Sequence, residues 1–199
     1  AAPAVTTLAD GGRQLDIITP TNSTTAVATL TLVQGPAAAG NVVTGNNLLV
    51  VGNVTTANYG GLPSTAPGAT VAGTLSFSPH AITSTSIAAA RTITVIDTPA
   101  ANDLVLSANI ISEGAIFPTG TTLAKASAGR LLLSNNNSFL EALTVNAGPV
   151  LITNSGALGV PSLVPGQFGA TVAAGAALEL SGGITLSEES RSEPGAFSS

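Results

Sequence analysis

The sequence contains no cysteine, no methionine and no tryptophan, and charged residues make up only 8% of its 199 residues. The lack of cysteine excludes disulfide bonds, thiolate catalysis and zinc–thiolate sites. Only five residues are basic, against ten acidic ones, and the five are scattered along the chain. Nucleic-acid binding requires clustered cations that neutralise phosphates, so we expect no nucleic-acid partner. No apolar run approaches the roughly 18 residues of a membrane span, so we expect no membrane insertion.

Hydrophobic residues nevertheless make up 44% of the chain while aromatic residues make up 3%, so that Ala, Val, Leu and Ile supply the apolar mass. Disordered chains are poor in aliphatic residues and rich in charge, so this composition favours an ordered, repetitive fold. The chain does not begin with methionine but with Ala1-Ala2-Pro3-Ala4. Small residues at this position are typical of a chain released from a signal peptide. We therefore expect an extracellular or cell-surface protein.

Strand patterns recur along the chain, whereas the helical i, i+3, i+4, i+7 pattern is nearly absent. Aliphatic residues or Phe alternate with Thr, Ser or Glu, as in half-buried strands, at 29–32, 74–77, 92–95, 178–180 and 184–186. Short continuous aliphatic runs at 48–51 and 131–133 indicate more deeply buried strands. Residues that favour turns separate these segments at 34–36, 44–47, 59–61, 135–137 and 181–183.

The spacing of the predicted strands favours a solenoid over a sandwich. The strand centres lie near Leu30, Leu49, Leu75, Ile93, Leu104, Leu132, Leu151 and Leu178. Several of the intervals between them are close to the length of a solenoid coil, about 20–30 residues. Strands of a β-sandwich follow one another at intervals of about 8–12 residues, and only the step from Ile93 to Leu104 is that short. The sequence therefore predicts an all-β parallel β-solenoid, in which small aliphatic side chains stack like on like, with a β-sandwich as the alternative.

Part of the chain resembles a known repeat. A Gly129-x-Leu131-x-Leu133 strand is followed by an Asn-rich turn at 135–137 with Phe139, by Thr-Val-Asn-Ala-Gly at 144–148, and by Gly-Ala-Leu-Gly at 156–159. This order is similar to the autotransporter-associated β-strand repeat of large secreted bacterial surface proteins. The resemblance implies a right-handed parallel β-helix of the passenger type. Two features depart from the family pattern: residues 139–142 replace its glycine, and Pro149 occupies a strand position.

The resemblance covers about half of the chain, so we divide the sequence into three parts. Residues 1–90 are expected to form degenerate solenoid coils with an N-terminal arm, and residues 91–186 the region that resembles the repeat. The polar segment 187–199 is expected to form a tail packed on a neighbouring subunit.

No residue stands out as catalytic, cofactor-binding or metal-binding, and we expect no cofactor. His80 is the only histidine, which disfavours a metal site or a catalytic triad, and a Gly-x-Ser-x-Gly elbow is absent. Asp97 and Asp103 flank a short turn and carry oxygens that suit Ca²⁺. The sequence lacks the EF-hand loop and the calcium-binding nonapeptide, so solvated loop carboxylates are the favoured interpretation.

Two further patterns concern the surface. Thr29-x-Thr31 and Thr92-x-Thr94 resemble the flat threonine rows of ice-binding solenoids, but two such pairs are too few, since Thr is a favoured outward residue of strands. Glycosylation sequons begin at Asn22, Asn53 and Asn136, and whether they are used stays open.

These observations predict a secreted, non-enzymatic structural protein. Solenoid ends expose unpaired backbone groups and apolar core, and neither terminus carries an amphipathic helix that could act as a cap. We therefore expect copies of the chain to cover each other's ends and form an extracellular fibre. A passenger-type adhesin or surface-layer module that binds a glycan or a host surface is one alternative. A carbohydrate-active β-helix enzyme is a weaker alternative, because the acids are spread out and no Lys or Arg lies near an acidic pair in the sequence.

Overall fold

A computed structural model describes residues 5–7, 14–17, 25–35, 39–45, 47–58, 67–77, 90–112, 122–160 and 170–186. Within these ranges the chain forms 18 β-strands joined by turns and bends, and no helix occurs in them. A helix able to cross a membrane is accordingly not found in this part of the chain. His80, Asn22 and the predicted tail at 187–199 lie outside the described residues.

The strands form three sheets, and the described strands within them pair in parallel. Sheet A has seven strands in the order β1 (Val5–Thr7), β4 (Leu30–Gln34), β7 (Val54–Asn58), β10 (Ala90–Thr94), β13 (Thr122–Ala126), β15 (Ala142–Val145) and β17 (Ala170–Val172). Sheet B also has seven strands, β2 (Gln14–Ile17), β5 (Asn41–Thr44), β8 (Ala69–Ala72), β11 (Leu104–Leu106), β14 (Leu131–Leu133), β16 (Gly148–Ile152) and β18 (Ala176–Leu180). Sheet C has four strands, β3 (Thr25–Val27), β6 (Leu48–Val50), β9 (Thr74–Ser76) and β12 (Asn109–Ile111).

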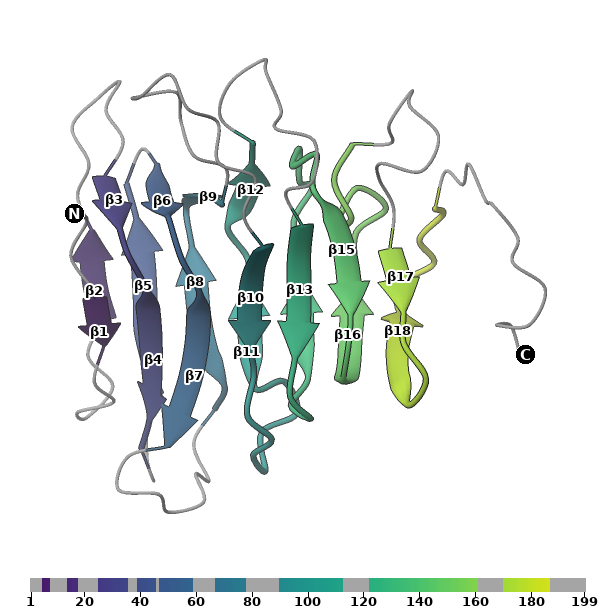
Figure 1. Cartoon of the computed structure of the whole chain (residues 1–199), viewed down its shortest axis with the longest axis horizontal. Helices are drawn as coiled ribbons and strands as arrows, with labels where there is room; N and C mark the ends of the chain where they lie inside the picture. The colour runs from purple at the N-terminus through teal and green to yellow at the C-terminus, as the bar shows by residue number, and fades with distance from the viewer. Residues whose placement is uncertain are drawn as a thin grey trace.

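The chain visits the sheets in turn, and this makes the fold a parallel β-solenoid. Each of the seven coils adds one strand to sheet A and then one to sheet B, and the first four coils add a third strand to sheet C. Figure 1 shows the coils following one another along the long axis, with β1 and β2 at one end and β17 and β18 at the other. The solenoid prediction is confirmed. The β-sandwich alternative is wrong, because the sheets of a β-sandwich are antiparallel, whereas the strands here pair in parallel.

The strand register shows that the coils are unequal in length. One position of sheet A recurs at Val5, Leu30, Val54, Ile93, Lys125, Val145 and Val172. The longest of these steps leads from Val54 to Ile93 and the shortest from Lys125 to Val145. The intervals predicted in the first half of the chain differ from the true coils because they joined strands of different sheets, such as Leu30 in sheet A and Leu49 in sheet C. The later predicted intervals joined strands of sheet B and match its coils to within one residue.

Two columns of register-matched positions run through all seven coils, and from the second coil to the sixth their side chains are part of the buried interior. The first interior column consists of Val5, Leu30, Val54, Ile93, Lys125, Val145 and Val172 in sheet A. The second interior column consists of Leu15, Val42, Val71, Leu106, Leu133, Ile152 and Leu180 in sheet B. From the second to the sixth coil, these side chains are at most 1% exposed. Burying one such aliphatic side chain stabilises the fold by about 1.5–3 kcal/mol, which explains how the core forms without tryptophan.

Most predicted strands are present, with two corrections. The alternation at 29–32 and 92–95 is confirmed, with Leu30, Leu32, Ile93 and Val95 buried. Residues 184–186 do not form a strand, because Gly182 and Gly183 adopt φ values of 93° and 66° and end the pairing of β18. Ser76, predicted to face outward, is fully buried at the end of β9.

Candidate functional site

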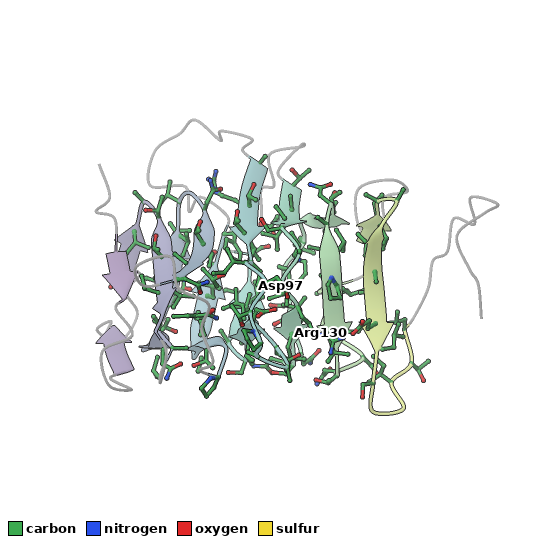
Figure 2. The ribbon with its side chains drawn as sticks, turned by 90° about the horizontal axis from the view of Figure 1, so that it is seen from below. Asp97 and Arg130 are labelled. Carbon is green, nitrogen blue, oxygen red and sulfur yellow. The ribbon has the colours of Figure 1, made fainter. Side chains whose placement is uncertain are left out.

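The two carboxylates singled out from the sequence play different parts. Asp97, labelled in Figure 2, lies in the turn between β10 and β11. It is exposed, whereas Asp103 is only 2% exposed. Asp103 Oδ1 accepts hydrogen bonds from the backbone N–H of Thr98 at 2.8 Å and from the Thr98 hydroxyl, and Oδ2 accepts one from the backbone N–H of Arg130 at 2.7 Å. The prediction that both are solvated loop carboxylates is therefore wrong for Asp103. Its oxygens close a turn and attach it to the next coil.

The same residues do not assemble a calcium site or an acid–base pair. No group of three or more His, Cys, Asp or Glu side chains that could hold a metal ion occurs in the described ranges. Glycoside cleavage requires two carboxyl groups that face a bound sugar. Asp103 instead faces backbone N–H groups, so this pair offers no basis for that chemistry.

Lys125 is a charged residue in the middle of the first interior column, between Ile93 and Val145. Its side chain is fully buried, and Nζ donates hydrogen bonds to the carbonyl oxygens of Ser127 at 2.5 Å and Ala147 at 2.7 Å. Burial lowers the pKa of the Lys125 amine to about 8, and the charge of Asp103 partly opposes this shift. The amine thus joins its own coil to the following one.

The Lys125 amine also depends on a glycine. Gly148 has a φ of 65°, and a Cβ atom there would lie 2.6 Å from Lys125 Nζ and 2.5 Å from the carbonyl oxygen of Ala128. Only a residue without a side chain leaves room for this arrangement. The Thr-Val-Asn-Ala-Gly segment therefore has a local purpose, because its last residue makes space for the buried amine.

A buried pair of opposite charges lies at the amino-terminal ends of β10 and β15. Arg91 and Glu141 are each 7% exposed. Burial lowers the pKa of the Arg91 guanidinium, and the nearby Glu141 charge opposes this shift. Glu141 Oε2 accepts hydrogen bonds from the Ser112 hydroxyl at 2.7 Å and from the backbone N–H of Leu140 at 3.1 Å. These contacts tie the end of the fourth coil to the start of the sixth.

The Asn-rich turn connects three coils through one side chain. Asn137 is 4% exposed; its Oδ1 accepts the backbone N–H of Ile110 at 2.9 Å, and its Nδ2 donates to the carbonyl oxygen of Ala157 at 2.7 Å. Ile110 belongs to the fourth coil, Asn137 to the fifth and Ala157 to the sixth. Asn135 Nδ2 adds a bond to the carbonyl oxygen of Ser107 at 3.0 Å. The turn is thus a stacking element of the solenoid.

Threonines form a larger array than the two predicted pairs. In sheet A, one column of register-matched positions contains Thr6, Thr31, Thr55, Thr94 and Ala126, and a neighbouring column contains Thr92, Ala124, Thr144 and Thr171. From the second coil to the sixth, the side chains of both columns lie on the outer face of the sheet. Thr29 is exposed directly before β4. The strand register therefore extends the two pairs with threonines from four further strands, β1, β7, β15 and β17. These two columns contain no charged residue.

The outer face of sheet B differs from this array. Its column contains Asn41, Thr70, Val105, Leu132, Leu151 and Glu179, and the position in register with Asn41 in β2 is Gln14. Glu179 forms an ion pair with Arg130 at 3.0 Å, and both side chains are roughly one third exposed (38% for Arg130 and 35% for Glu179). Threonine is therefore concentrated on one face and does not merely reflect the composition of the chain.

Two of the three sequons fall within the described residues. Asn53 and Asn136 are both exposed. Asn53 Oδ1 accepts the backbone N–H of Thr92 at 2.9 Å, so this side chain joins the third coil to the fourth. Their glycosylation stays a prediction.

Comparison with protein-family models, with curated proteins and with solved structures found no match to this chain. The site must therefore be interpreted from its own chemistry. Sequence reasoning missed Lys125, Arg91 and Glu141, although the inward position of Lys125 in the alternating segment 122–126 was a usable signal. Lys125, Asp103 and Glu141 each form hydrogen bonds that connect coils.

Proposed function

We propose that this chain is an extracellular structural protein that self-assembles into a fibre or surface filament through end-to-end contacts between solenoids. The observation that carries the proposal is the state of the last coil. Val172 and Leu180 end the two interior columns and are 40% and 52% exposed, whereas the residues stacked beneath them, Val145 and Ile152, are fully buried. Positions that are core elsewhere are open to solvent there, and another coil would bury them.

The backbone at both ends supports the same proposal. Within the described residues, β1 and β2 at one end and β17 and β18 at the other each pair on one side only. A free parallel edge presents unpaired N–H and C=O groups that can template a further strand. Contact between two different ends is heterologous, and it yields a filament when its rotation does not close a ring.

The buried polar groups favour a structural role over a catalytic one. Lys125, Asp103 and Asn137 are all used in bonds between coils. The resemblance to autotransporter-associated repeats, which are passenger-type β-helices of secreted bacterial surface proteins, points in the same direction. We therefore propose a bacterial cell-surface or extracellular location and no enzymatic activity.

Electron microscopy with one matched pair of variants tests this function. Leu180→Lys places a charge on the exposed end of the second interior column and should abolish fibres, because an unpaired charge would be buried in each contact. Val160→Lys is the control, since Val160 is 45% exposed and lies outside the strands of the last coil. We expect long uniform fibres for the natural chain and the control, and short rods for Leu180→Lys. Monodisperse short rods of the natural chain at high concentration would contradict the proposal.

The threonine columns favour a second function, adhesion through the outer face of sheet A. A flat, uncharged array of hydroxyl and methyl groups, repeated at the strand spacing of about 4.8 Å, suits an ordered lattice of hydroxyl groups or water. Thr55→Lys with Thr94→Lys should abolish binding, whereas Leu132→Lys with Leu151→Lys on sheet B should not. Binding to crystalline polysaccharide supports an adhesin, and shaping of ice crystals supports ice contact. Absence of both would reject the second function.

A further inference from the structure

We infer that two copies of this chain join head to tail in a single register, in which Val172 and Leu180 of one copy continue onto Val5 and Leu15 of the next. This inference rests on the proposed function, because it specifies the contact through which the fibre would form. It identifies the partner of the open last coil as the first coil of a second copy.

The first argument is the constancy of the register within one chain. Across six successive coil-to-coil steps, the first interior column continues from Val5 to Val172 and the second from Leu15 to Leu180. The sequence separation between the two columns changes along the chain, from ten in the first coil to seven in the sixth and eight in the last. Both columns nevertheless keep an unbroken strand register through all seven coils. Both ends of the solenoid therefore offer the same two aliphatic positions on parallel strands. A first coil placed on a last coil therefore repeats a contact that the molecule already makes six times.

The second argument concerns the outer column of sheet B, which begins at Gln14 and ends at Glu179. In the proposed register, position 14 of the next copy, a glutamine, pairs with position 179, a glutamate, so no like charges stand opposite each other. A slip by two residues toward the carboxyl end of β2 would instead pair position 179 with position 16, an aspartate, and like charges directly opposite each other are destabilising. A slip by one residue would turn the interior columns outward. Both errors are therefore disfavoured.

The third argument distinguishes this contact from a tail-to-tail one. Two last coils facing each other would meet with antiparallel strands and would close as a dimer, because the contact is isologous. The interior columns continue as parallel rows only when a last coil meets a first coil. Head-to-tail contact leaves one free end of each kind after every addition, so it can grow.

Cysteine cross-linking tests the register directly, because the natural chain contains no cysteine. In Gln14→Cys with Glu179→Cys, the two positions would lie about 4.8 Å apart across the contact, within the roughly 4.4–6.8 Å that a disulfide accepts between Cα atoms. Inside one chain they are six strand spacings apart, or about 29 Å, so an intramolecular disulfide cannot form. Mild oxidation of the assembled full chain should therefore give a ladder of dimers, trimers and longer species on a non-reducing gel.

Three control variants make the outcome specific. Gln14→Cys alone and Glu179→Cys alone can give no species beyond a dimer. Asp16→Cys with Glu179→Cys shifts one position by two residues, or about 6.6–6.8 Å along the strand, and should lose the ladder. A ladder from this shifted pair but not from the first pair would overturn the register. Efficient dimer formation by Glu179→Cys alone, with no ladder from the double variant, would show tail-to-tail contact and would equally overturn it.

Microscopy of the same samples separates failure of this inference from failure of the proposed function. Fibres that form without a ladder would refute the register and leave the fibre proposal standing. Short rods without a ladder would refute both. Fibres of the Gln14→Cys with Glu179→Cys variant that become resistant to dilution only after oxidation, and lose this resistance on reduction, are the result that the inference predicts.

Discussion

The buried amine of Lys125 should make the solenoid more stable in mild alkali. The folded-state pKa of Lys125 is about 8, below its ordinary value of 10.5, because the charged amine is removed from water. Between these two values the unfolded chain binds more protons than the folded chain, so the free energy of unfolding rises with pH. Below pH 8 the cost of burying the charge is fully present. Above pH 10.5 it is gone.

The size of the effect follows from the same two values. One pKa unit corresponds to about 1.36 kcal/mol, so a shift from 10.5 to about 8 sets an upper bound of about 3–4 kcal/mol on the gain in the free energy of unfolding. The hydrogen bonds to the carbonyl oxygens of Ser127 and Ala147 hold the amine in either protonation state, so the fold itself should persist. We expect a rise of about 2–3 kcal/mol between pH 8 and pH 10.5.

Urea unfolding at half-unit pH steps measures this rise, and two variants isolate its source. Lys125→Met keeps an unbranched side chain of similar length but cannot titrate, so its stability should be flat where the natural chain gains. Tyr59→Phe removes the only tyrosine, a residue type whose ordinary pKa is about 10, and should leave the rise in place. Identical pH slopes for the natural chain and Lys125→Met would refute the assignment of the gain to this amine.

Three further substitutions should each destabilise the stack by a measurable amount in urea unfolding at pH 7. Asp103→Asn weakens the closed turn and should lower the free energy of unfolding by about 1–3 kcal/mol. Asp97→Asn changes an exposed carboxylate and should lower it by less than about 0.5 kcal/mol. Equal losses for the two variants would contradict the role of the buried carboxylate. Asn137→Ala removes bonds to two neighbouring coils and should cost about 2–4 kcal/mol, and the exposed Asn136→Ala provides the comparison that must stay near neutral. Gly148→Ala combines a φ of 65° with overlap on a backbone carbonyl and should cost about 2–4 kcal/mol, so a neutral result would show that the turn can relax.

The solenoid could be predicted from the sequence because its strands carry a local signal. The alternation at 92–95 and the run at 131–133 indicate buried strands without knowledge of any other part of the chain. Coil lengths could not be predicted, since the connections between strands vary. The coil from Lys125 to Val145 is about half as long as the one from Val54 to Ile93. Nothing in the sequence states which strand belongs to which sheet.

The candidate sites depended on that missing register. Asp103 and Arg130 are far apart in the sequence and meet only because β11 and β14 stack, so the sequence suggested a solvated carboxylate. The threonine columns have the same origin. Thr31, Thr55 and Thr94 occur at unequal intervals, and they form a row only when a short coil and a long coil are correctly aligned.

The unequal coils have a mechanical consequence. Force applied along the solenoid axis pulls on the hydrogen bonds between coils lengthwise, so the coil at one end can peel away while the remainder stays folded. Each detached coil releases a length set by its own residues, from roughly 70 Å for the shortest coil to roughly 140 Å for the longest, at about 3.6 Å per residue. The bridge that Asn137 makes across three coils resists such peeling in the second half of the chain. A tether built from such coils would lengthen in unequal steps and absorb work at each one, while its unpeeled part kept its shape.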